Sequence, residues 1–129
     1  MNRKNERNPG ALLDPSLLKL VVADDSNLAL DIVRDLFESI GAEVHTIASA
    51  IGLSGLVRRV QPDAVILDVN MPAIRGDEAI ATVRHLCPHA TVVLFSSDPK
   101  CAEYAKTCGV PWVGKTEPNR LVSIVLRGK

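Results

Sequence analysis

The sequence predicts an α/β domain whose parallel β-sheet is covered by helices on both faces. Five short apolar segments alternate along the chain with five segments in which apolar residues recur at helical spacing. Most of the apolar segments lack the alternation of a strand with one face in water, so they are expected to be buried on both faces. Regular alternation of strand and helix is typical of right-handed crossovers between parallel strands.

Length and composition fit one folded domain. A chain of 129 residues with 47% hydrophobic content can bury a core without disulfides or metal. Residues 1–16 are rich in Asn, Arg and Pro and are expected to form a poorly ordered arm, which leaves residues 17–129 as the folded domain. The three cysteines contain no CxxC pair, suit a reducing compartment and are expected to pack on helix faces; they are Cys87, Cys101 and Cys108.

Charge and motifs narrow the class of function. Fifteen basic and fifteen acidic residues cancel, so nothing in the overall charge favours nucleic acid as a partner. Neither GxxxxGK[ST] nor GxGxxG is present, which argues against nucleotide binding. The sequence shows no leader-like or membrane-spanning stretch, so we expect a cytoplasmic protein that does not interact with membranes.

The first strand and helix are the most clearly marked elements. The strand is expected at residues 19–23 and ends at the paired acids Asp24 and Asp25. Ser26 is a suitable N-cap for a helix whose apolar residues between positions 28 and 40, including Leu28, Ile32 and Phe37, are expected to face the core.

The other elements follow in the same alternation, and each ends at a recognisable signal. Gln61-Pro62 stops the second helix, Asp98-Pro99 begins the fourth and Gly109 ends it. The remaining strands are expected at residues 43–47, 64–67, 91–95 and 111–114, and the remaining helices at 49–60, 76–86, 99–108 and 119–127.

Three carboxylates are expected to meet at one edge of this sheet. Asp24 and Asp25 follow the first strand, and Asp68 follows the third. In open α/β sheets, ligands and chemistry collect beyond the carboxyl ends of the strands. Acids so close together repel, and either their pKa values rise or a divalent cation neutralises them. Because no Cys or His shares the site, Mg²⁺ is the expected cofactor.

Taken singly, these residues have ordinary explanations. Asp24 and Asp25 are suited to capping the first helix, Asp68 to a cap or loop, and Lys115 to a solvated surface. Their joint placement, with Ser96 after the fourth strand and Lys115 after the fifth, indicates a phosphoryl site. Asp68 is the expected nucleophile, forming an aspartyl phosphate, while Asp24 and Asp25 hold the metal. Metal, hydroxyl and ammonium would then bind the three phosphoryl oxygens.

The motifs resemble those of the receiver domain of two-component response regulators. The resemblance covers about residues 17–127, and its motifs occur in the family's order. They are KLVVADDS at 19–26, ILDVNMP at 66–72 followed by Gly76, LFSS at 94–97, and Lys115. It implies a flavodoxin-like, doubly wound fold with sheet order 2-1-3-4-5.

The resemblance also implies a function. A histidine kinase or phosphotransfer protein would phosphorylate Asp68, and Mg²⁺ would be bound by Asp25, Asp68 and the Asn70 backbone carbonyl, with Asp24 acting through water. The chain would be a signalling module rather than a turnover enzyme, acting on an unknown downstream protein as a monomer or weak homodimer.

By the same resemblance, Ser96 and Trp112 form the switch. Ser96 takes the position of the hydroxyl that binds the phosphoryl group, and Lys115 that of the family's lysine. Trp112 takes the position of the aromatic residue that changes rotamer as the hydroxyl moves. The output is a population shift in the surface formed by the fourth helix, fifth strand and fifth helix.

Four departures from the family pattern lead to further expectations. Thr116 replaces a proline whose peptide bond is often cis, so a trans bond is expected after Lys115. The segment from Ser96 to Lys115 is about three residues shorter than usual, so the fourth helix is expected to be shortened by nearly one turn. Ser97 replaces a common alanine, and Trp112 is bulkier than the usual aromatic residue, which hinders an inward rotamer.

Two other functions remain open from the sequence. One is a receiver-like scaffold that binds partners without phosphorylation, and the other is a Mg²⁺-dependent phosphohydrolase that uses Asp68 as nucleophile, which the lack of a cap domain disfavours. Asn70 and Asp98 are expected to flank the phosphoryl group and orient a water, giving a short-lived signal. Because no output domain follows Lys129, the chain is either a stand-alone regulator or a fragment.

Overall fold

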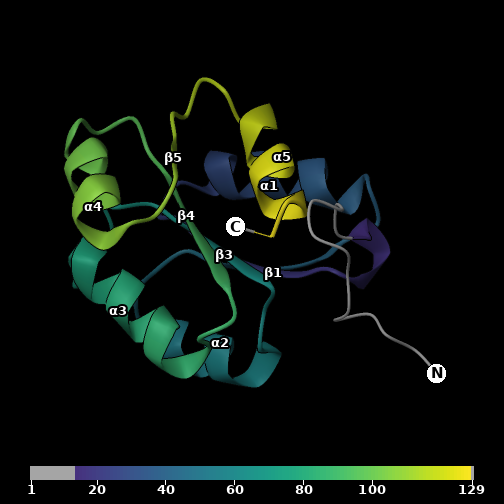
Figure 1. The fold of residues 1–129 in the computed structure, drawn as a ribbon, viewed down its shortest axis with the longest axis horizontal. Coiled ribbons are helices and arrows are strands. Elements are labelled where there is room, and N and C mark those ends of the chain that lie inside the picture. Colours follow the sequence, from purple (N-terminus) through teal and green to yellow (C-terminus); the bar gives the residue numbers. More distant parts are fainter. Residues whose placement is uncertain (1–13, 129) are drawn as a thin grey trace.

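The computed structural model describes residues 14–128 and has the expected α/β architecture (Figure 1). Within those residues, five parallel strands form one sheet in the order β2-β1-β3-β4-β5, which confirms the predicted topology. The strands are β1 (Lys19–Ala23), β2 (Glu43–Ile47), β3 (Ala64–Leu67), β4 (Thr91–Phe95) and β5 (Trp112–Val113). The helices are α1 (Asn27–Glu38), α2 (Leu53–Val60), α3 (Gly76–Leu86), α4 (Lys100–Cys108) and α5 (Asn119–Leu126), preceded by a short 3₁₀ helix, η1 (Pro15–Leu17).

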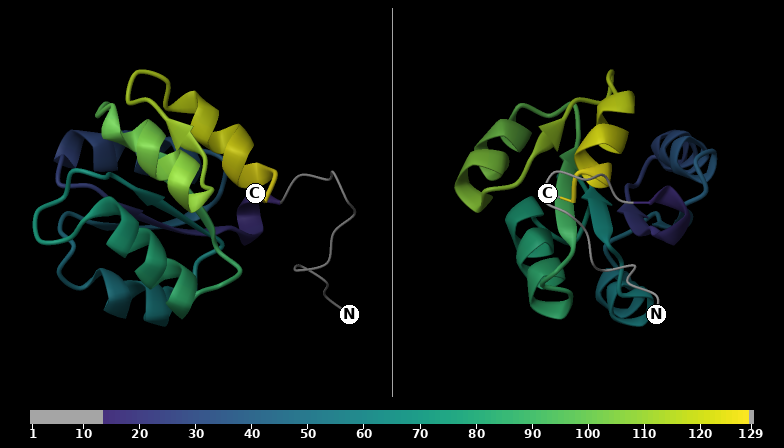
Figure 2. Two further views of the ribbon diagram at one scale, coloured as in Figure 1. Left: turned by 60° about the vertical axis from the view of Figure 1, so that its left-hand side comes forward. Right: turned by 45° about the vertical axis from the view of Figure 1, so that its right-hand side comes forward.

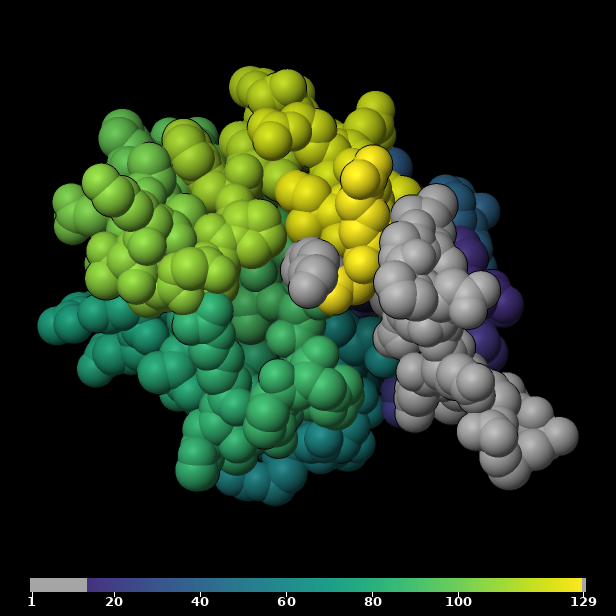
Figure 3. Space-filling model, in the orientation of Figure 1, coloured from purple at the N-terminus to yellow at the C-terminus, as the bar shows by residue number. Residues whose placement is uncertain are grey.

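The helices cover the sheet on both faces. Figure 2 shows α1 and α5 on one side and α2, α3 and α4 on the other. Successive residues of β1 point alternately into the two cores: Val21 joins the core under α2 and α3, whereas Leu20 and Val22 join the one under α1 and α5. In the space-filling view, the atoms of α4 and α5 lie above those of α3 on this face of the molecule (Figure 3). The unbroken apolarity of β1 and β3 therefore reflects burial on both faces.

The start of the described chain has a defined local structure. Residues 1–13 of the predicted arm lie outside the described residues. Asp14 caps η1, because its Oδ1 accepts the backbone N–H of Ser16 at 2.9 Å. Ser16 in turn lies against Gly41, which has a φ of +96° that favours glycine. Residues 14–16, placed in the arm by the sequence, thus adjoin the end of α1.

The burial predicted for α1 is partly wrong. Leu28 and Ile32 were expected to face the core but are 70% and 41% exposed. The side chains that α1 buries are instead Ala29, Leu30, Val33 and Phe37. Position 28 is rotated by about 100° from position 29 around the helix, which carries Leu28 away from the sheet. The apolar stripe of α1 is therefore wider than its buried face.

The start of α2 also differs from the prediction. The helix begins at Leu53 and not at Ser49, because Gly52 adopts a left-handed conformation with φ +87°. The hydroxyl of Ser49 accepts the N–H of Ile51 at 3.0 Å in the turn before it. Ile51, an apolar residue within the range 49–60 predicted for this helix, consequently lies outside the helix and is 79% exposed.

Two expectations concern the segment after β4. The bond between Lys115 and Thr116 is trans, as predicted, and no peptide bond within residues 14–128 is cis. The helix α4 ends at Cys108, as expected, and left-handed Gly109 closes it. Its nine residues exceed the eight of α2 and of α5, so a shortening relative to the family stays a prediction. None of the helices in the described part of the chain is long and apolar enough to cross a membrane.

Candidate functional site

The three predicted acids lie together at the carboxyl edge of the sheet. Strands β1 and β3 are paired neighbours, with Ala23 opposite Leu67, so the residues that follow them emerge side by side. One carboxylate oxygen from each of Asp24, Asp25 and Asp68 lies within 4.8 Å of the other two. The strand ends alone thus account for the convergence that the sequence suggested.

The acids differ in their exposure to solvent. Asp24 and Asp68 are 2% and 7% exposed, whereas Asp25 is exposed. The Oδ1 atom of Asp24 accepts the N–H of Ser26 at 2.9 Å. Burial raises the pKa of Asp24 above its ordinary value, an effect that the bonds from Lys115 and Ser26 oppose and the charge of Asp68 reinforces.

Lys115 supplies the positive charge of the site. It follows β5, and its Nζ lies 2.7 Å from Oδ2 of Asp24 and 3.7 Å from Oδ2 of Asp68. The same ammonium lies 5.3 Å from the centre of the Phe95 ring, which favours a cation over its face. Lys115 therefore partly compensates both buried acids, and its shorter contact is with Asp24.

Ser96 is buried at the end of β4, at the same edge. Its hydroxyl accepts the N–H of Asp98 at 3.1 Å, and its own N–H donates to the Val113 carbonyl at 3.1 Å. The indole Nε1–H of Trp112, a partly exposed residue, donates to the Ser96 carbonyl at 3.1 Å. The two residues assigned to the switch are thus joined directly through the Ser96 backbone.

Asn70 and Asp98 lie at the mouth of the site. The backbone N–H of Asn70 donates to Oδ1 of Asp68 at 3.1 Å. The backbone N–H of Lys100, followed by the side chain of Asn70, holds the pKa of Asp98 below its ordinary value. Asp98 is consequently an anion next to Asn70, and the expectation that the two residues flank a phosphoryl group stays a prediction.

Cys101 is a neighbour of the site that sequence reasoning placed only as a packing residue. It is fully buried in the first turn of α4. Burial, and then the charges of Asp68 and Asp98, raise the pKa of its thiol to about 12. The group is therefore a neutral thiol near the acids. The one signal in the sequence for its nearness to the acids is the position of Cys101 directly after Asp98-Pro99 and Lys100, in the first turn of α4.

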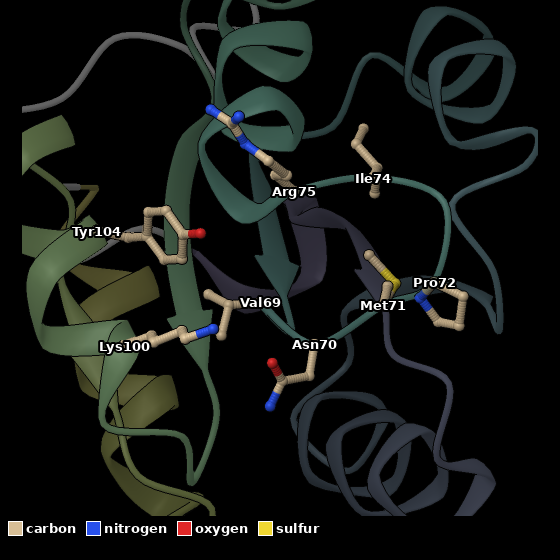
Figure 4. A pocket seen from close by; sticks show the side chains of 8 residues that line it. All are labelled: Val69, Asn70, Met71, Pro72, Ile74, Arg75, Lys100 and Tyr104. Carbon is tan, nitrogen blue, oxygen red and sulfur yellow. The ribbon is translucent and has the colours of Figure 1, made fainter.

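A recess of about 420 Å³ adjoins the site between α4 and the loop that follows β3. Figure 4 shows Lys100 and Tyr104 reaching from α4 towards that loop. The recess is lined by Val69, Asn70, Met71, Pro72, Ile74, Arg75, Lys100 and Tyr104. Gly76 permits this close approach, since a Cβ there would lie 3.1 Å from Val69 Cγ1 and 3.3 Å from Tyr104 Cδ2.

The donors at the acidic cluster suit a hard divalent cation. They are carboxylate oxygens, with the backbone carbonyl of Asn70 nearby in sequence, and Mg²⁺ prefers oxygen ligands. Oxygens on opposite sides of one Mg²⁺ lie about 4.2 Å apart. Three carboxylate oxygens that all lie within 4.8 Å of one another are therefore close enough to share one ion.

Comparison with known proteins identifies the family. A family model described as the response regulator receiver domain matches residues 20–111 of this chain. The chain belongs to the receiver domain family. This confirms the resemblance inferred from the motifs, and the match includes every site residue named above except Trp112, Val113 and Lys115.

Several known proteins are similar to this chain over part of its length. A protein-glutamate methylesterase/protein-glutamine glutaminase of Clostridium acetobutylicum is 30% identical over 95 residues, covering 70% of this chain and 27% of that protein. The chemotaxis protein CheY of Listeria monocytogenes is 31% identical over 83 residues, 63% of this chain and 69% of CheY. The matched region thus spans about a quarter of the methylesterase relatives' length.

Solved structures show the same fold. The chemotaxis protein CheY4 of Vibrio cholerae superimposes with a TM-score of 0.75 at 24% sequence identity, covering 87% of this chain and 98% of that one. A beryllofluoride-activated DrrB receiver domain gives a TM-score of 0.73, also at 24% identity.

The structure also contains contacts that the sequence did not indicate. The sequence does not indicate that Lys115 pairs with Asp24, because Asp24 and Asp68 both lie within reach of this lysine. The bond from Trp112 to the Ser96 carbonyl likewise depends on the rotamer of the indole. The strand ends did indicate which residues meet, but not which of them bond.

Proposed function

We propose that this receiver domain accepts a phosphoryl group on Asp68, in a Mg²⁺-dependent reaction, from a histidine kinase or phosphotransfer protein. One observation carries the proposal: a nearly buried carboxylate, Asp68, shares the end of the sheet with two further acids within 4.8 Å and faces a lysine. Such a group is poised both to bind a cation and to attack phosphorus.

The chemistry requires an attacking oxygen and compensation of charge. A carboxylate oxygen of Asp68 forms the new bond to phosphorus, while the bond between phosphorus and the donor breaks and its electron pair leaves with the donor. Asp24, Asp25, Asp68 and the Asn70 carbonyl would hold Mg²⁺, which when bound supplies positive charge to the phosphoryl oxygens. The Ser96 hydroxyl and the Lys115 ammonium bind the remaining oxygens.

The output is a change in the surface around α4, β5 and α5. Movement of Ser96 towards a phosphoryl group would disturb the bond between its carbonyl and Trp112, which is 3.1 Å long in this structure. That bond offers a direct route from the acceptor site to β5, and the shifted surface would bind a downstream protein. In this proposal the chain is a signalling module without a turnover reaction.

A scaffold that binds partners without phosphorylation is the second candidate. The observation in its favour is the 2.7 Å contact of Lys115 with Asp24, which compensates a buried acid without a cation. Such a scaffold would need neither Mg²⁺ nor an intact Asp68 in order to bind its partner.

A small acyl phosphate separates the two candidates. Incubation with this donor and Mg²⁺ should add one phosphoryl group to the wild-type chain, as seen by intact-protein mass spectrometry. The increment should be absent from Asp68→Asn and from wild type in EDTA, and present in Asp35→Asn, a control on the exposed side of α1. A wild-type chain that gains no phosphoryl group under these conditions supports the scaffold.

A further inference from the structure

Lys115 pairs with Asp24, although Asp68 is the proposed acceptor. Its Nζ is 2.7 Å from Asp24 Oδ2 and 3.7 Å from Asp68 Oδ2. Asp24 is almost completely buried and the lysine side chain is 24% exposed. A charge-assisted bond of this length in a shielded place is among the stronger polar contacts of a protein.

Both oxygens of Asp24 already have partners. Oδ1 accepts the N–H of Ser26 at 2.9 Å, and Oδ2 accepts the ammonium of Lys115. The Ser26 bond belongs to the backbone turn that begins α1, whereas the lysine is a flexible side chain. Oδ2 is therefore the oxygen of Asp24 that can be freed more easily. A cation that approaches it is repelled by the positive charge of Lys115.

Lys115 has a second place to go. Asp68 Oδ2 is 3.7 Å from the same ammonium, and the ring of Phe95 lies 5.3 Å away on the side of β4. The lysine would remain in the site after it leaves Asp24, because the second acid and the aromatic face both attract it. A small movement of one side chain thus transfers its charge from one acid to the other.

We propose that Lys115 competes with the divalent cation for Asp24, and that cation binding shifts the Lys115 ammonium onto Asp68. This inference rests on the proposed function, since it assumes that the acids bind a cation. Lys115 then has two roles: it compensates Asp24 when no cation is bound, and it moves to the acceptor carboxylate when one is. The cost of displacing it lowers the affinity of the site for the cation.

The size of the effect follows from simple electrostatics. An ammonium about 5 Å from a divalent ion, even at the dielectric constant of bulk water, weakens binding of that ion by roughly tenfold. Removing the charge while keeping the length of the side chain should therefore tighten Mg²⁺ binding by about that factor. Salt reduces the difference, so the measurement belongs at low ionic strength.

The test is a Mg²⁺ titration at pH 8 of wild type, Lys115→Met and Lys106→Met. Lys106→Met removes the same net charge from the last turn of α4, away from the acids. Binding is measured by calorimetry and by the fluorescence of Trp112, the single tryptophan. Lys115→Met should bind Mg²⁺ about tenfold more tightly than wild type, and Lys106→Met should match wild type.

The possible results are distinguishable. Equal affinities of wild type and Lys115→Met overturn the competition but leave the proposed cation site intact. No Mg²⁺ response in either protein overturns the cation site itself, and the inference with it.

A measurement on wild type covers the case in which Lys115→Met fails to fold. The NMR signals of the Lys115 side-chain Cε should move as Mg²⁺ is added, while those of Lys106 should not. Lys115 signals that stay in place as Mg²⁺ saturates the protein would contradict the displacement.

Discussion

Substitution of Gly76 by alanine should destabilise the domain and disturb the acceptor site. Gly76 is the first residue of α3, and a Cβ there would lie 3.1 Å and 3.2 Å from Cγ1 and Cβ of Val69, and 3.3 Å from Cδ2 of Tyr104. Such contacts are tighter than ordinary van der Waals separations, so the neighbours must move. Val69 is buried between Asp68 and Asn70, and its displacement would move both residues.

The two effects of the new methyl group oppose each other. Alanine favours a helix over glycine by up to about 1 kcal/mol in a helix interior, and by less at the first position. Overpacking of a well-packed region costs about 1–3 kcal/mol. Because the Cβ of Val69 is fixed to the backbone and cannot rotate away, the steric cost prevails. We expect a net loss of about 1–2 kcal/mol in the free energy of unfolding.

Gly55 provides a matched control within α2. A Cβ at Gly55 would meet no atom within 4 Å, so Gly55→Ala should gain about 0.5–1 kcal/mol from helix propensity alone. Urea unfolding followed by circular dichroism, analysed at constant m, gives both values. A Gly76→Ala variant as stable as wild type would refute the reasoning, as would a destabilised Gly55→Ala.

Three further predictions concern the site. Burial raises the pKa of Asp24, so the native state binds a proton on this carboxylate more tightly than the unfolded chain does. The stability of wild type relative to Asp24→Asn, measured in EDTA, should therefore fall as pH rises from 3.8 through the raised pKa. Urea unfolding across pH 4–8 measures this difference, and a rise would contradict it. Cys101 is buried and its thiol has a pKa of about 12, so it should resist alkylation in the native protein at pH 8, whereas the partly exposed Cys108 should react. Peptide mass spectrometry locates the label, and alkylated Cys101 would contradict the burial. Asn70→Ala should slow loss of the phosphoryl group if the amide orients the hydrolytic water, and an unchanged decay rate would exclude that role.

Much of the fold follows from local sequence signals. The apolar runs of β1 and β3 fix the buried strands, and Ser26 and Gly109 mark helix ends where the structure has them. The exposure of Leu28 and Ile51 could not be predicted from such local signals. An apolar residue marks the possible core face of a helix, but the packing angle of the helix and the turn before it decide which positions reach the sheet.

The site shows the same division between placement and contact. Strand ends bring Asp24 and Asp68 to one edge, so their neighbourhood was predictable from strand order. Whether Lys115 bonds one acid or the other depends on differences of an ångström in side-chain position, 2.7 Å against 3.7 Å here. No spacing in the sequence encodes such a difference, and the nearness of Cys101 to the acids similarly depends on how α4 is seated.

The most direct test of the account is to map the phosphorylated residue. After reaction with a small acyl phosphate and Mg²⁺, borohydride reduces an aspartyl phosphate to homoserine, which tandem mass spectrometry locates in the chain. The account predicts homoserine at position 68 and at no other aspartate. Homoserine at Asp24 or Asp25, or at no position, would contradict the assignment of Asp68 as the acceptor.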